Sequence, residues 1–320
     1  CVLSKPMNKA KCCGYQESQI LALNETKTYL ANMWDSSYGA GLFFSALHEL
    51  GEHMFIPLKI DGKNFYACHG IFDGLSAYEY VNKKFKLGLN LKSAKKNLPK
   101  NSLLTLVKAF FSALFSKPLQ EHRYPSDPQP YSSASHAHFF HLSFEEEKGA
   151  EQSTAYFLNV FARYCMKKFS TNNISRWQFA VNVRGEVAAS QKGQVFASFL
   201  SIDCEESDTI ESTKLKLTRK LKSKEYLGFW YLSRFLRFLG PKILTYLTKK
   251  ELAKKETSWF GLFTNLGDIG GNGTHEVLLF PTVRWHRPIA GLIFKHNKKI
   301  YLTVELHQRL AISNEDLGKI

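Results

Sequence analysis

Cys68-His69-Gly70-Ile71-Phe72-Asp73-Gly74 is the stretch that indicates how this chain is organised. The apolar run Asn64-Phe65-Tyr66-Ala67-Cys68 predicts a buried strand that delivers His69 at its end. Asp73 follows four residues later, and a helical pattern runs from Leu75 to Phe85. A histidine at a strand end, beside a tight turn with a carboxylate, suits proton transfer. Taken alone, the H-x-x-x-D-G spacing is common by chance, and a strand-end histidine is usually structural.

The segments around this stretch predict helices interleaved with strands. A hairpin with strands at 55–60 and 63–68 turns at Asp61-Gly62, and basic residues crowd a helical region at 211–255 that is broken at Gly240-Pro241. Further helices are predicted at 18–33, 39–54, 103–115 and 152–169, and further strands at 136–144, 177–184, 195–203, 259–264, 277–281, 290–295 and 300–306. The pattern predicts an α/β (α+β) fold with mixed sheets.

A linker divides the chain. Residues 117–135 (KPLQEHRYPSDPQPYSSAS) hold four prolines and four serines without apolar periodicity. We therefore expect an N-terminal half at 1–116 and a C-terminal half at 136–320.

Composition restricts the class of protein. The chain has 320 residues, 25 Phe, 14 Tyr and a formal net charge of +15, so we expect a folded protein with an anionic partner. No uncharged apolar run is long enough for a transmembrane helix. The cysteines form no C-x-x-C pair, which favours reduced thiols in a cytoplasmic protein. They are Cys1, Cys12, Cys13, Cys68, Cys165 and Cys204.

One internal comparison suggests a duplication. Residues 60–73 can be laid over 294–311, since each segment has a strand, a polar turn with lysine, a second strand and a final histidine, His69 or His307. Ala311 stands in the second segment where Asp73 stands in the first. A duplicated site that has decayed would give this pattern, and so would two ordinary hairpins.

The chain resembles the chloramphenicol acetyltransferase-like superfamily, which includes condensation domains, wax ester synthases and alcohol acyltransferases. The resemblance rests on His69-x-x-x-Asp73-Gly74, on Val181-Asn182-Val183-Arg184 and on Phe263-Thr264-Asn265-Leu266-Gly267. Cys68 replaces the first histidine of the superfamily's H-H-x-x-x-D-G motif. Only 68 residues precede His69, so the first half looks trimmed, and the plant D-F-G-W-G motif is absent.

The resemblance implies two halves with an active-site channel between them. It implies acyl transfer from an acyl-CoA or acyl-carrier-protein thioester to a hydroxyl or amine, with a small-molecule or lipid-like acceptor and no permanently bound cofactor. His69 would be the general base, and Thr264 would donate to the oxyanion. Asp73 would pair with Arg184 as a structural ion pair. The remaining structural positions at the site would be Gly74, Asn265 and Gly267.

Each of these assignments has a structural alternative. Arg184 could be a surface charge and Thr264 a simple strand former. His136, His138 and His141 have strand spacing, but no further metal ligand is evident, so we expect no metal there.

The basic residues of 214–255 are compatible with several kinds of partner. Two amphipathic helices with a buried aromatic face and solvated lysines are the simplest interpretation. The sharper alternatives are coenzyme A phosphates, an acidic carrier protein or a membrane surface, which would make the protein peripheral to a membrane. A non-catalytic member that binds a carrier protein or membrane is the alternative to an enzyme. No nucleic-acid-binding motif is present, so we expect no nucleic acid.

Overall fold

The computed structural model places part of the chain. It describes residues 17–22, 24, 55–69, 71–89, 103–114, 122–123, 137–145, 154–170, 172–183, 186, 197–235, 242–243, 246–247, 250, 256–257, 259–270, 275–284, 287–307 and 310. In this part of the chain the strands form sheets of three, six and two strands, so the fold is mixed α/β, as predicted.

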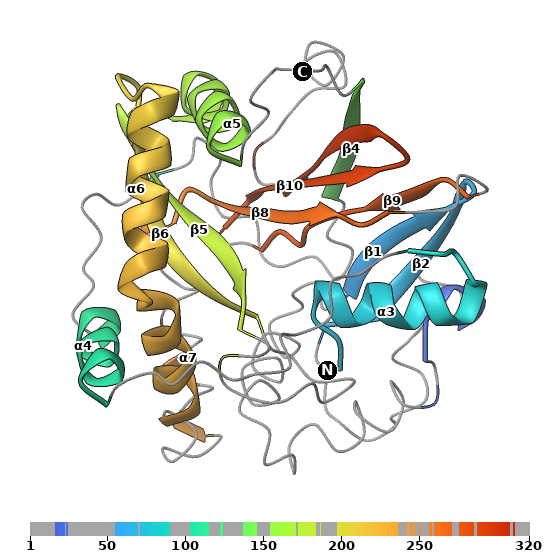
Figure 1. The fold of residues 1–320 in the computed structure, drawn as a ribbon, viewed down its shortest axis with the longest axis horizontal. Helices are drawn as coiled ribbons and strands as arrows, with labels where there is room; N and C mark the ends of the chain where they lie inside the picture. The colour runs from blue at the N-terminus through green and yellow to red at the C-terminus, as the bar shows by residue number, and fades with distance from the viewer. Residues whose placement is uncertain are drawn as a thin grey trace.

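The smaller main sheet has the order β2-β1-β9. It consists of β1 (Phe55–Ile60), β2 (Lys63–Cys68) and β9 (Val277–Leu279), all antiparallel. Asp61 and Gly62 join β1 to β2 with φ of 47° and 77°, the left-handed backbone that a two-residue hairpin turn requires. Helix α3 (Gly74–Phe85) follows β2 and packs beside this sheet (Figure 1).

The larger sheet has the order β4-β11-β10-β8-β5-β6. Strand β8 runs parallel to both of its neighbours, whereas the other pairs are antiparallel. The strands are β4 (Ala137–Glu145), β5 (Ile174–Asn182), β6 (Ala197–Glu205), β8 (Gly261–Asp268), β10 (Ile289–His296) and β11 (Lys299–His307).

Four helices lie at the other side of the molecule from α3 (Figure 1). They are α4 (Leu103–Leu114), α5 (Thr154–Phe169), α6 (Ile210–Ser223) and α7 (Glu225–Phe235). Helices α5 and α6 cover the larger sheet, α7 lies against β6, and α4 packs outside α7. Three short elements remain, η3 (Glu17–Gln19), β3 (His122–Arg123) and β7 (Glu256–Thr257), of which the last two pair.

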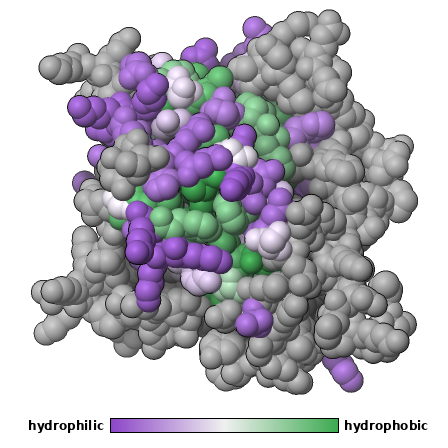
Figure 2. Space-filling view, turned by 90° about the vertical axis from the view of Figure 1, so that its right-hand side faces the viewer, coloured by the Kyte–Doolittle hydropathy of each residue, from purple (hydrophilic) through white to green (hydrophobic). Residues whose placement is uncertain are grey.

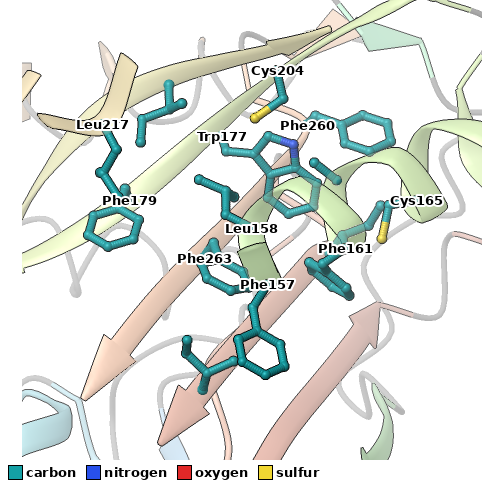
Figure 3. Close-up of a cluster of buried hydrophobic side chains, with 14 of the residues drawn as sticks. Phe157, Leu158, Phe161, Cys165, Trp177, Phe179, Cys204, Leu217, Phe260 and Phe263 are labelled. Carbon is teal, nitrogen blue, oxygen red and sulfur yellow. The ribbon is translucent and has the colours of Figure 1, made fainter. Parts of the chain in front are cut away.

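One face of the larger sheet forms an apolar core with α5 and α6. Figure 3 shows Phe157 and Phe161 of α5 facing Trp177 of β5 and Phe263 of β8. Because strand side chains alternate between faces, the intervening residues of β5, β8, β10 and β11 point to the opposite face.

The opposite face packs on the smaller sheet. Leu292 and Phe294 of β10 join a second core with Leu58 of β1 and Val81 of α3. Thr303 Oγ1 of β11 donates to the carbonyl of Leu279 in β9 at 2.5 Å, which ties the two sheets together. Figure 2 shows the right-hand side of the molecule as drawn in Figure 1, where hydrophilic side chains surround hydrophobic patches.

Most of the predicted elements are confirmed, with shifts of a few residues at their ends, and two predictions need correction. Residues 20–22 do not continue a helix, because the Leu21 N–H donates to the Tyr66 carbonyl at 2.9 Å and the segment pairs with β2. The basic helical region has a further break at Lys224, whose φ of 56° ends α6, whereas the predicted break at Gly240-Pro241 lies outside the described residues. The predicted helix at 39–54 lies outside the described residues, as does most of the linker.

Several contacts cross the expected boundary between the halves, and two of them join whole elements. Strand β9 comes from the C-terminal half and pairs with β1. Helix α4 comes from the N-terminal half and packs on α7, closely enough that a side chain at Gly228 would collide with the Ala109 carbonyl.

Candidate active site around His69

His69 lies in a tight turn that connects β2 to α3. The strand ends at Cys68, which is fully buried, and the Cys68 carbonyl accepts hydrogen bonds from the N–H groups of Ile71 (3.1 Å) and Phe72 (2.9 Å). These bonds fold the chain back directly after the strand. The turn therefore holds His69 at the edge of the smaller sheet, as the sequence predicts.

Asp73 caps the helix that follows this turn. Its Oδ1 accepts from the Ser76 N–H at 2.9 Å, and Ser76 Oγ accepts from the Asp73 N–H at 2.9 Å, which completes a capping box. The carboxyl group is buried and points into the protein rather than to solvent. Gly74 is the first residue of α3 and lies against Tyr78. The proposed partner Arg184 lies outside the described residues, so the Asp73–Arg184 pair stays a prediction.

The surroundings of His69 keep its imidazole neutral. Burial, and then the positive charge of Arg284, lower its pKa to about 4. Its own backbone and Asp73 act in the opposite direction, and Arg287 adds the smallest lowering effect. The residue keeps some exposed surface, whereas Nδ1 is buried. At neutral pH the ring is therefore ready to accept a proton.

Both arginines belong to a turn between β9 and β10. The Arg284 N–H donates to the Arg287 carbonyl at 3.0 Å, and the Arg287 N–H donates to the Arg284 carbonyl at 2.9 Å. Arg284 is buried, and the Arg287 guanidinium donates to Oε1 of Gln178 in β5. The turn thus connects the neighbourhood of His69 to the larger sheet.

Glu305 is a buried carboxyl group in the same neighbourhood. Burial raises its pKa well above the ordinary value, although the Val283 N–H and the charges of Arg284 and Arg287 act in the opposite direction. Within the described residues neither carboxyl oxygen has a hydrogen bond of ordinary geometry. Burial is the dominant effect, so folding favours the protonated form of Glu305 and raises its pKa.

Thr264 lies on the same face of the larger sheet as these polar groups. Its neighbour Phe263 points into the core under α5, so Thr264 points to the opposite face. On that face Leu262, two residues away, is the cross-strand neighbour of Gln178, which binds Arg287. Thr264 thus shares a sheet face with Gln178, the residue that binds the arginine turn.

Asn265 and Gly267 shape the end of β8. The Asn265 Nδ2 donates to Thr154 Oγ1 at 2.5 Å, and its Oδ1 accepts from the Gly267 N–H at 2.7 Å. Gly267 has φ of 71°, and the register with β10 shifts at this point, so the strand bulges. A residue with a side chain would be strained there, which supports a structural role for the glycine.

The sequence patterns did not indicate four further polar residues of this region, namely Arg284, Arg287, Glu305 and Gln178. The two arginines could have been predicted from the run Arg284-Trp285-His286-Arg287-Pro288, in which two cations precede a proline at the start of a strand. Glu305 alternates with Thr303 and His307 on β11, which predicts a shared face but not burial. His138 and His141 lie on β4, and no group of three or more metal-ligating side chains occurs among the described residues.

No protein-family model matches this sequence, and no curated protein matches it. The solved structures to which the chain is similar include the epimerization domain from the third module of tyrocidine synthetase B (13% identity, TM-score 0.41, 78% of this chain and 64% of that chain covered). Another is the starter condensation domain of rhizomide synthetase RzmA (12% identity, TM-score 0.44, 80% and 62% covered). A third is TRI101 of F. sporotrichioides complexed with coenzyme A and T-2 (12% identity, TM-score 0.45, 80% and 65% covered).

This chain spans less than two thirds of the length of each of these structures, at 62–65%. From likenesses at these TM-scores we take no activity, substrate or partner.

Proposed function

We propose that this protein is an acyltransferase that moves an acyl group from a coenzyme A or acyl-carrier-protein thioester to a hydroxyl or amine acceptor. The observation that carries the proposal is the partly buried His69 imidazole in the turn after β2, where burial, and then the charge of Arg284, lower its pKa to about 4. A base must be unprotonated to act, and this ring stays unprotonated over a wide pH range.

In the proposed reaction His69 takes a proton from the acceptor as the acceptor oxygen or nitrogen attacks the thioester carbonyl. Because Nδ1 is buried, Nε2 is the nitrogen that meets the acceptor. The tetrahedral intermediate then collapses, the carbon–sulfur bond breaks, and the protonated ring returns the proton to the departing thiolate. No covalent enzyme intermediate forms.

Thr264 is the proposed donor to the oxyanion, since its side chain shares a sheet face with Gln178, which is bonded to the arginine turn. Loss of one oxyanion donor slows a reaction by roughly two to three orders of magnitude. Asp73 has no part in proton transfer in this scheme. It fixes the start of α3 and thereby the turn that carries His69.

The test is release of free thiol from acetyl-, octanoyl- and palmitoyl-CoA, because thioester cleavage can be followed before the acceptor is known. We expect His69→Gln to lower the rate about 10²- to 10⁴-fold. Thr264→Val should lower it by roughly two to three orders of magnitude and Thr264→Ser should retain it. His141→Gln on the exposed strand β4 is the matched control and should be unchanged.

Cleavage by His69→Gln at the wild-type rate would overturn the proposal. A folded protein that binds an acyl carrier protein, yet shows no His69-dependent thiol release with any donor, would instead be a non-catalytic binding protein.

A further inference from the structure

Helix α4 is anchored to the rest of the molecule through one side only. Ala109 is buried where α4 crosses Gly228 of α7, and Leu106 packs against the larger core. In Figure 1 the helix lies at the outer edge of the molecule, beyond α7. Its remaining side therefore faces away from the protein core.

That outer side of α4 is apolar. Leu104 is 62% exposed, Phe111 is 51% exposed and Val107 is 41% exposed, and the three follow helical spacing on one face. Lys108 is exposed beside them, and α4 contains no acidic residue. Several large apolar side chains exposed together on one helix face indicate an interaction surface.

The segment 242–250 also exposes apolar side chains next to lysines. Ile243, Tyr246 and Leu247 are helical and exposed, at 49%, 64% and 42%. Lys242 and Lys250 share their face by helical spacing, and residues 226–250 contain no Asp or Glu. Exposed apolar residues flanked only by cations are typical of helices that lie in a membrane interface.

Two lysines of α6 already form ion pairs within the protein. Lys216 Nζ lies 2.7 Å from Asp208 Oδ2, and Lys220 Nζ lies 2.6 Å from Glu225 Oε2. These lysines are held by carboxylates of the protein itself. Two of the basic residues of α6 are thus neutralised within the protein, whereas Lys242 and Lys250 lie beside exposed apolar residues.

We propose that the outer face of α4 and the exposed residues Ile243, Tyr246 and Leu247 are docking sites for an anionic lipid bilayer. The apolar side chains would enter the interface, and Lys108, Lys242 and Lys250 would contact the anionic headgroups. Among the described helices none has the length and apolarity needed to cross a bilayer, so the surface would lie on the membrane and not span it. The proposal is independent of acyl transfer.

The test is co-flotation of the full chain with vesicles of phosphatidylcholine alone and of phosphatidylcholine with 30% phosphatidylserine. We expect binding to the anionic vesicles only, weakened by 0.5 M salt. Leu104→Gln with Val107→Gln and Phe111→Gln should weaken binding at least about tenfold, since interfacial binding scales with the buried apolar area. Ile243→Gln with Tyr246→Gln and Leu247→Gln should do the same.

The matched control is Tyr156→Gln with Val160→Gln on α5, two residues that are exposed to a similar degree outside the proposed surface. This variant should bind as the wild type does. Circular dichroism and thermal midpoints show that each variant is folded.

Three outcomes overturn the proposal. They are binding to neither vesicle, equal binding to both, and equal loss in the α5 control. If an acidic acyl carrier protein binds instead, and the α4 variant abolishes that binding, the partner is a protein and not a membrane.

Discussion

The two hairpins β1–β2 and β10–β11 use the same backbone device in different surroundings. Each turns through two residues with positive φ, 47° and 77° at Asp61-Gly62 and 49° and 64° at Asn297-Lys298. Each brings a histidine to the end of its second strand. His69 directly follows β2, and His307 is the last residue of β11.

The surroundings of the two histidines differ. The chain after His69 turns into a capped helix, and two arginines from a remote segment act on the imidazole. His307 is buried, and its N–H donates to the Pro288 carbonyl at 2.8 Å. A strand-end histidine is therefore not enough to define a site, because the groups that tune its protonation come from elsewhere in the chain.

The sharpest test of this difference exchanges each histidine for glutamine. His69→Gln should lose about two to four orders of magnitude of thioester cleavage and remain folded. His307→Gln should retain cleavage within about threefold and lose roughly 1 kcal/mol of stability, the usual cost of changing a buried polar group. Thiol release and urea unfolding of the two variants, measured in parallel, give both numbers. Equal loss of cleavage in both would mean that the second hairpin is also catalytic.

The pH dependence of cleavage tests the influence of the arginines on His69. With its pKa lowered to about 4, the acid limb of the rate profile should fall near pH 4 and not near 6.5. At pH 5 the neutral fraction would be about 30-fold that of an ordinary histidine. The profile of Arg284→Gln should move toward higher pH, whereas Lys84→Gln on α3 should leave it in place.

The same lowered pKa affects stability. Between pH of about 4 and 6.5 the unfolded chain binds more protons at this residue than the folded one, so its contribution to stability falls as the pH decreases through this window. His69→Gln should remove that part of the acid sensitivity. Unfolding measured at pH 5 and pH 7.5 in both proteins would detect the change.

The capped helix that follows the first hairpin is the next difference between the two. Asp73→Ala should cost about 1–2 kcal/mol, because the capping bond to Ser76 is lost. Asp73→Asn keeps a good cap but removes the charge. If the Asn variant is as stable as the wild type, the cap is the main role of Asp73. If it is as unstable as the Ala variant, an ion pair such as the predicted one with Arg184 matters more.

The smallest effects are expected in the turns. Gly62→Ala places a side chain at φ of 77° and should cost about 1 kcal/mol. Lys298→Gly relieves the same conformation at φ of 64° and should stabilise by up to about 0.5 kcal/mol. Thermal midpoints should therefore move in opposite directions. A shift of both in one direction would show that the turns are not equivalent.

Local patterns predicted the local parts of the fold. The Asp61-Gly62 turn, the strand before His69 and the helix after Gly74 depend on neighbouring residues, and the structure has all three. The patterns at 177–184 and 259–264 similarly predicted strands, and in the structure Trp177, Phe179 and Phe263 of β5 and β8 lie in the core.

Non-local pairing could not be predicted in the same way. The edge of β2 offers backbone groups that capture the segment at Ile20, against its helical periodicity. Arg284 and Arg287 come close to His69 only because β9 pairs with β1. No residue spacing in the sequence indicates that β9 pairs with β1. The roles of His69 and Thr264 remain proposals that the experiments above address.

The position of β9 has a consequence for how the chain folds. The second edge of strand β1 stays unpaired until Val277–Leu279, more than two hundred residues later in the chain, has been synthesised. Closing so long a loop is slow, and an unpaired strand edge can meanwhile pair with another chain. During synthesis the hairpin that carries His69 would thus emerge early and be completed last. A fragment that ends before residue 277 should aggregate, and chaperones that shield strand edges should improve the yield of the whole protein.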